Sequence, residues 1–140
     1  VLISIASDAF RREFAESAQI LGKMGFKLLG TPGTASFYQD NYGLDFTNVS
    51  KPVHKDDNGP GTALEAIREG GVALVINISD GTTRRDEISA GYLVRRAAVD
   101  FGIGLITNVK CAVWLATSMS KGMHKFKAKS ISEFYSLHRD

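Results

Sequence analysis

The stretch Phe26–Thr34, FKLLGTPGT in one-letter code, joins an apolar run to a small polar turn. The run Phe26–Leu29 is typical of a short buried strand, and residues 35–42 after the turn have a helical pattern. A strand that passes through Thr31-Pro32-Gly33-Thr34 into a helix leaves several backbone N–H groups unpaired at one point. Two threonine hydroxyls accompany these groups, so the turn predicts an anion site, most often for a phosphate.

Strands and helices alternate on both sides of this turn. The predicted strands cover residues 1–6, 26–29, 45–49, 72–76 and 103–107. The predicted helices cover residues 8–24, 35–42, 62–69, 88–101 and 111–119, and a tail helix at 133–137 is expected to pack on the outside. This order predicts an α/β three-layer sandwich with a mostly parallel, five-stranded central sheet over residues 1–120, followed by a basic connection and tail at 121–140.

The composition limits the classes of partner. The chain has 140 residues, of which 44% are hydrophobic and 23% charged, as is typical of one globular domain. No apolar run approaches the roughly 20 residues that cross a bilayer, so we expect no membrane partner. The net charge of +2 comes from residues 121–140, and the slightly acidic remainder predicts no nucleic acid polymer as a partner. Because the chain opens in a strand pattern without Met, we expect a domain of a longer polypeptide.

Polar residues follow the predicted strands where these end. In a parallel sheet the carboxyl ends of the strands share one edge, and ligands bind there. We therefore expect a ligand site formed by Thr31, Gly33, Thr34, Lys51, Asn77, Ser79 and Asp80. Arg11 joins them because it lies in the first turn of a helix, where the dipole disfavours a cation unless an anion is near. Helix capping, ordinary turns and a solvated lysine are the alternatives for these positions.

The histidines, the cysteine and the adjacent arginines give weaker indications of a functional site. His54, His124 and His138 lie far apart, which predicts no metal site, no other cofactor and no Ser–His–Asp triad. Cys111 is the single cysteine, and its apolar helical setting predicts a buried, inert thiol. Arg95 and Arg96 point about 100° apart on one helix, so only one of them can line a site.

Six segments resemble one family when they are taken in order. They are Ile3–Ile5, Phe10-Arg11, Gly25–Leu28, Thr31–Ala35, Leu74–Asn77 and Tyr92–Asp100. Together they resemble the C-terminal regulatory domain of the carbamoyl-phosphate synthetase large chain, which has the methylglyoxal synthase-like fold. The resemblance runs from Val1 to about Met119.

The resemblance implies binding of an allosteric effector rather than catalysis by this chain itself. The family's effectors are uridine or inosine nucleotides, phosphoribosyl pyrophosphate or N-acetylglutamate. By motif, Thr31 and Thr34 hold the effector's phosphate or carboxylate, and Arg11, Lys51, Asn77 and Ser79 contact the rest. Members that bind acetylglutamate have Trp in place of Lys51 and lack the glycine of the turn, so a phosphorylated effector is expected.

Two alternatives remain open. A methylglyoxal synthase-type lyase acting on dihydroxyacetone phosphate would keep the family aspartates Asp8 and Asp80. The family's catalytic aspartate falls near Pro60-Gly61, however, and its histidine is Ser7, so no general base is evident. The other alternative is an assembly module, which associates as a homo-oligomer. By resemblance, pyrimidine-pathway members are cytoplasmic and urea-cycle members mitochondrial, so the cytoplasm is expected and the mitochondrial matrix is the alternative.

Overall fold

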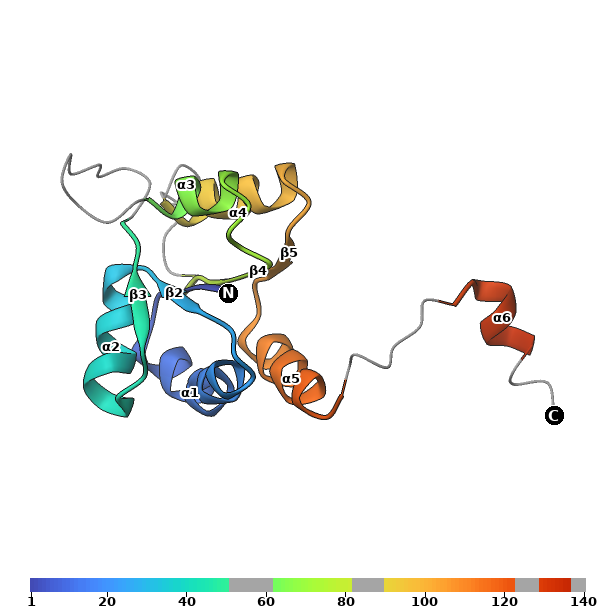
Figure 1. The fold of residues 1–140 in the computed structure, drawn as a ribbon, viewed down its shortest axis with the longest axis horizontal. Helices are drawn as coiled ribbons and strands as arrows, with labels where there is room; N and C mark the ends of the chain where they lie inside the picture. The colour runs from blue at the N-terminus through green and yellow to red at the C-terminus, as the bar shows by residue number, and fades with distance from the viewer. Residues whose placement is uncertain (51–61, 82–89, 123–128, 137–140) are drawn as a thin grey trace.

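The computed structural model describes residues 1–50, 62–81, 90–122 and 129–136 (Figure 1). Its five strands form one sheet in the order β3-β2-β1-β4-β5, and every neighbouring pair is parallel. The strands are β1 (Leu2–Ile5), β2 (Leu28–Gly30), β3 (Phe46–Asn48), β4 (Leu74–Ile78) and β5 (Gly104–Ile106). The predicted sheet is confirmed, and its described strands are parallel throughout.

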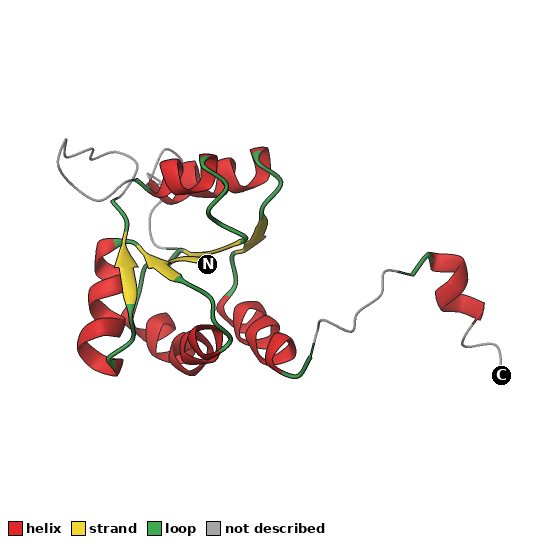
Figure 2. Ribbon diagram, in the orientation of Figure 1, coloured by secondary structure: helices red, strands yellow, loops and turns green. Residues whose placement is uncertain are grey.

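Helices cover both faces of the sheet (Figure 2). One layer contains α1 (Asp8–Lys23), α2 (Pro32–Tyr42) and α5 (Val109–Ser120), and the other contains α3 (Ala63–Arg68) and α4 (Ala90–Asp100). Side chains alternate between the faces along each strand, so Ile3 and Ile5 join the first core while Leu2 joins the second. The three-layer sandwich is therefore confirmed.

Local signals set the helix boundaries. Ser7 caps α1, because its side chain accepts a hydrogen bond from the Phe10 amide at 3.3 Å. Thr62 and Glu65 form a capping box at the start of α3. Gly43 ends α2 with a φ of 61°, a left-handed conformation that glycine adopts without strain.

Two predictions about side-chain burial are wrong. Cys111 is exposed, because α5 turns Val109, Ala112 and Ala116 toward the core instead. The apolar stripe of the helix predicted at residues 88–101 (Ile88, Tyr92, Ala97, Ala98 and Phe101) is expected to face the core, but Tyr92 and Phe101 are 42% and 53% exposed, and Ile88 lies outside the described residues. The helix α4 buries Val94, Ala97 and Ala98 because small side chains allow close approach to the sheet. The predicted stripe therefore contained part of the buried face, Ala97 and Ala98, while its two aromatic residues face outward.

The tail helix α6 (Ile131–Ser136) lies apart from the layers in Figure 1. Its Ile131 and Tyr135 are 78% and 67% exposed, so the expected packing of this helix on the outside of the domain is not present in the structure. None of the described helices is both long and apolar enough to span a membrane.

Candidate functional site

The first part of the site is the arginine near the start of α1. Arg11 donates from Nε to the Ile5 carbonyl at 2.9 Å and from Nη1 to Asp8 Oδ1 at 2.6 Å. Its guanidinium also lies 5.7 Å from the ring centre of Phe37. These contacts hold a cation at the carboxyl end of β1, with only 16% of its side chain exposed. Among the described residues, its Nη2 has no acceptor.

The threonines of the turn lie together, as expected. Thr31 Oγ1 is 3.3 Å from Thr34 Oγ1 and donates to Ser4 Oγ at 3.3 Å. Thr34 is fully buried, and its Oγ1 accepts from the Ile5 amide at 3.0 Å. Thr34 therefore joins the start of α2 to the end of β1, and Arg11 binds the carbonyl of that same Ile5.

The expectation of several free N–H groups at the turn is wrong. The Thr31 amide donates to the Ile3 carbonyl at 3.4 Å, and the Thr34 amide donates to the Thr31 carbonyl at 2.8 Å. Pro32 has no N–H to offer. Gly33 alone in this turn keeps an amide without an acceptor among the described residues, because no side chain caps α2. A Cβ added at Gly33 would lie 3.2 Å from Arg11 Nη2, so the guanidinium lies directly against this residue of the turn.

The second part of the site is formed by β4 and α4. Asn77 is 3% exposed, and its Oδ1 accepts from Arg95 Nη1 at 2.7 Å. Gly91 leaves room for this pair, since a Cβ there would lie 3.1 Å from Arg95 Nη1. The register pairs Asn77 with Ser4 on the neighbouring strand. Polar side chains thus form a row across the sheet on the face that α4 covers. The row consists of Thr31 directly after β2, Ser4 on β1, Asn77 on β4 and Arg95 on α4.

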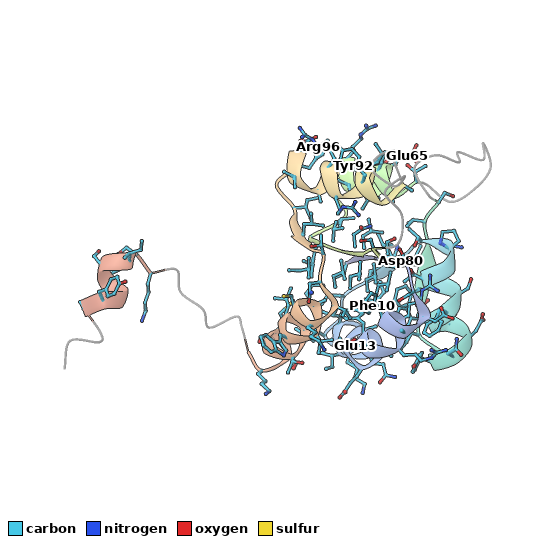
Figure 3. The ribbon with its side chains drawn as sticks, turned by 180° about the vertical axis from the view of Figure 1, so that it is seen from behind. Phe10, Glu13, Glu65, Asp80, Tyr92 and Arg96 are labelled. Carbon is cyan, nitrogen blue, oxygen red and sulfur yellow. The ribbon has the colours of Figure 1, made fainter. Side chains whose placement is uncertain are left out.

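The remaining predicted residues lie at the edge of this row or outside the described chain. Ser79 and Asp80 directly follow β4 and are exposed. Figure 3 shows Asp80 between α4, which carries Tyr92 and Arg96, and α1, which carries Phe10. Lys51 lies outside the described residues. The structure therefore gathers Arg11, Thr31, Gly33 and Thr34 in one group, with Asn77 beside it across Ser4.

A buried tyrosine contacts the backbone of Arg11, a member of the first part of the site. Tyr38 OH donates to the Arg11 carbonyl at 2.8 Å, and its ring stacks on Phe46 with centroids 5.1 Å apart. Burial raises the pKa of Tyr38 well above its ordinary value, so the phenol stays neutral and can donate.

Metal chemistry finds no support in the described part of the chain, which gathers no group of three His, Cys, Asp or Glu side chains. The three histidines lie outside the described residues.

Sequence reasoning missed two members of the polar row. Ser4 was detectable as the single polar residue inside an apolar strand, Leu2-Ile3-Ser4-Ile5. For Arg95 the prediction was incomplete: one of the two adjacent arginines at most was expected to face a site, but the sequence did not say which. Arg95 faces Asn77, while Arg96 points outward and binds the exposed Asp100 at 2.9 Å.

Comparison with known families gives a match over most of the chain. The model of the MGS-like domain family matches residues 13–107. A relative from Dictyostelium discoideum, multifunctional protein pyr1-3, is 40% identical over 123 residues, which cover 86% of this chain and 5% of the relative. The carbamoyl phosphate synthase large chain of Methanosarcina mazei is 35% identical over 138 residues, covering 96% and 12%.

Two further similarities concern the compartment and the fold. Carbamoyl-phosphate synthase [ammonia], mitochondrial, from Aquarana catesbeiana is 32% identical over 134 residues, covering 96% of this chain and 9% of the relative. The chain thus spans between 5% and 12% of the length of these relatives. A crystal structure of methylglyoxal synthase from Elizabethkingia anophelis aligns with a TM-score of 0.61 at 16% identity, covering 99% of this chain and 90% of that one. At that identity the likeness concerns the fold.

Proposed function

The chain belongs to the family of MGS-like domains, and we propose that it is the regulatory domain of a carbamoyl-phosphate synthetase, which binds a phosphorylated effector at the carboxyl edge of its sheet. The relatives that carry the synthetase name are much longer than this chain. In this proposal the chemistry of synthesis resides in the other domains of the parent chain, which are the partners of this one. The chain by itself is a sensor without catalytic activity.

One observation carries the proposal. At the start of α2, Arg11 Nη2 lies against Gly33, and neither this nitrogen nor the Gly33 amide has an acceptor among the described residues. The amide adds the partial positive charge of a helix N-terminus, and the guanidinium adds a full charge. A phosphate oxygen bound there would accept from both groups. The hydroxyls of Thr31 and Thr34 are engaged with each other and with β1, so their proposed contribution is to hold this turn in place.

The remainder of the effector would extend along the polar row. Asn77 and Ser79 are the proposed partners for a ribose or base, and Lys51 is the proposed second cation for the phosphate. Asp80, a carboxylate beside these groups, would accept a hydrogen bond from a hydroxyl of the ligand. This combination favours a nucleotide or a sugar phosphate such as phosphoribosyl pyrophosphate.

Regulation requires that the effector bind one conformation of the synthetase more tightly than another. Such a coupling is commonly about 1–3 kcal/mol. The isolated domain can show only that the effector binds. The two conformations with different effector affinity belong to the whole synthetase. We propose the cytoplasm as the compartment of this chain. The mitochondrial matrix is the alternative, because one relative is named as mitochondrial.

The test is calorimetric titration of the chain with uridine monophosphate, inosine monophosphate and phosphoribosyl pyrophosphate. We expect at least one to bind, and we expect Gly33→Ala to weaken that binding several-fold because the added methyl displaces Arg11 Nη2. Gly22→Ala is the matched control, since its Cβ would meet only Leu28 Cδ1 at an ordinary 3.6 Å. Absence of binding to all three by a folded chain would contradict the proposal, and so would equal binding by the two variants.

The same preparation tests the lyase alternative. Turnover of dihydroxyacetone phosphate by the chain, lost in Asp80→Asn, would replace the sensor proposal with an enzyme. The sensor proposal expects no turnover.

A further inference from the structure

A second concave surface lies at the opposite edge of the sheet, where the strands begin. It is a groove of about 720 Å³ between the C-terminal turns of α1 and α2. Its apolar lining consists of Phe26, Leu28, Tyr42 and Leu44. None of the proposed effector-site residues is among those that line it, so the groove is separate from that site.

The groove carries positive charge and exposed apolar surface at its mouth. Lys23 and Lys27 line it, against the single acidic residue Asp45. Tyr42 is 37% exposed, and Met24 next to Lys23 is 41% exposed. Large apolar side chains that gather at a hollow in this way are typical of a surface that is covered by another segment.

The helix α6 has matching features. Ile131 and Tyr135 are four residues apart, so they share one face of the helix, and both are largely exposed. Glu133 places a negative charge between them along the chain, and Ser130 caps the helix by accepting from the Glu133 amide at 3.3 Å. A helix of six residues is marginal in water without packing, so α6 needs a surface on which to bury its apolar face.

We propose that α6 docks in the groove of its own chain, with Ile131 and Tyr135 against Phe26 and Leu44 and with Glu133 toward Lys23 and Lys27. The contact would bury apolar side chains from both partners and pair opposite charges at the groove mouth. This occupant is favoured over a foreign one because the apolar face, the charge and the need for packing all lie on a segment that is already tethered.

The tether is long enough. The helices α1 and α5 pack side by side, with Lys110 Nζ 3.2 Å from Glu13 Oε1, and both run from the carboxyl edge to the opposite edge of the sheet. The end of α5 at Ser120 therefore lies at the same edge as Lys23. Ten residues separate Ser120 from Ile131, and an extended chain of that length spans about 33 Å, whereas adjacent packed helices are only about 10 Å apart.

Hydrogen exchange on the full chain tests the docking. Ile131→Asp should raise the exchange of amides in residues 22–28 and 42–47 several-fold, because a charge cannot enter the apolar groove. Ser132→Asp, which adds the same charge beside the apolar face, should leave that exchange unchanged. Equal exchange in the two variants would overturn the proposal.

A charge reversal in the groove identifies the occupant. Lys27→Glu should increase the exchange of the groove amides, because Glu133 would then face a like charge, and the protection in the intact chain should be the same at low and high protein concentration. Glu133 itself is left unchanged because its carboxylate accepts from the Ser130 amide at 2.6 Å and caps α6. Arg68→Glu, the same change on the exposed end of α3, should have no effect. Protection that appears only at high concentration would assign the groove to a second copy and overturn the proposal, and so would a Lys27→Glu variant that exchanges like the intact chain.

Discussion

The two halves of the carboxyl edge hold their arginines in different ways. In the first half, Arg11 is fixed by the Ile5 carbonyl, the Asp8 carboxylate and the Phe37 ring. In the second half, Arg95 donates to the neutral side chain of Asn77, its one hydrogen-bond partner in the described part of the chain. The first cation is in position before any ligand arrives, while the second is bound to a residue that is itself a proposed ligand contact.

This difference separates two roles. A cation that is already fixed loses little conformational entropy when it binds an anion, so the first half should supply most of the binding energy. The second half should instead stabilise the polar row, because Arg95 satisfies an amide oxygen that is nearly buried. Variants in each half should therefore act on different measurements.

The largest effect is expected for Arg11→Met. Loss of a charge-assisted hydrogen bond to the effector phosphate should cost about 1.5–3 kcal/mol, which weakens binding by about 10- to 150-fold. The measurement is calorimetric titration with whichever phosphorylated effector the intact chain binds. Circular dichroism verifies that the variant remains folded.

The neighbouring Arg12 provides the control for this change. It is exposed on the same helix and makes no ion pair among the described residues. Arg12→Met removes the same charge and should leave affinity nearly unchanged. Equal losses in both variants would mean that net charge, and not the fixed position of Arg11, attracts the ligand.

Thr34→Val should destabilise the fold by about 1–3 kcal/mol, because the buried Ile5 amide loses its acceptor. Urea denaturation measures this loss as a fall in the free energy of unfolding. Thr47→Val, at an exposed position on β3, is the matched control and should change stability little. If Thr34→Val proved as stable as that control, the link between β1 and α2 would not depend on this hydroxyl.

Arg95→Met should lower the free energy of unfolding by about 1–2 kcal/mol, since Asn77 Oδ1 is left without its donor. The adjacent Arg96→Met removes only a solvent-exposed pair with Asp100 and should have little effect. The two denaturation curves provide the comparison. A larger loss at Arg96 would contradict the assigned role of Arg95.

The order of elements was predictable because its signals are local. Apolar runs, glycine boundaries and the Ser7 cap each depend on a few neighbouring residues, and parallel topology then brings the strand ends to one edge. The site was predicted as a set of residues at that edge. That prediction placed Thr31, Gly33 and Thr34 together but misjudged which groups are free, because hydrogen bonds to β1 depend on how closely the strands approach.

The rest of the site depends on non-local geometry. The proximity of Ser4 to Thr31 follows from the register of β1 and β2, and the contact of Arg95 with Asn77 follows from the rotation of α4 about its axis. The same unknown rotation explains why Cys111, Tyr92 and Phe101 were placed on the wrong side of their helices. A sequence defines the spacing of a helical face, while packing against the sheet decides which face is buried.

The smallest expected effect concerns Tyr38, whose hydroxyl supports the first half through the Arg11 carbonyl. Because burial raises the pKa of Tyr38 in the folded chain, the fold favours the neutral phenol over the charged form. Its contribution is therefore fully present below the unfolded pKa of about 10 and is lost as the pH rises above that value.

Tyr38→Phe should lower the free energy of unfolding by about 0.5–1.5 kcal/mol at neutral pH, and the difference from the intact chain should shrink as the pH rises above about 10. Urea denaturation along a pH series gives both quantities. Tyr42→Phe, at an exposed tyrosine of the same helix, is the control and should not show the loss at neutral pH. A constant difference between Tyr38→Phe and the intact chain across that range would contradict the preference of the fold for the neutral phenol.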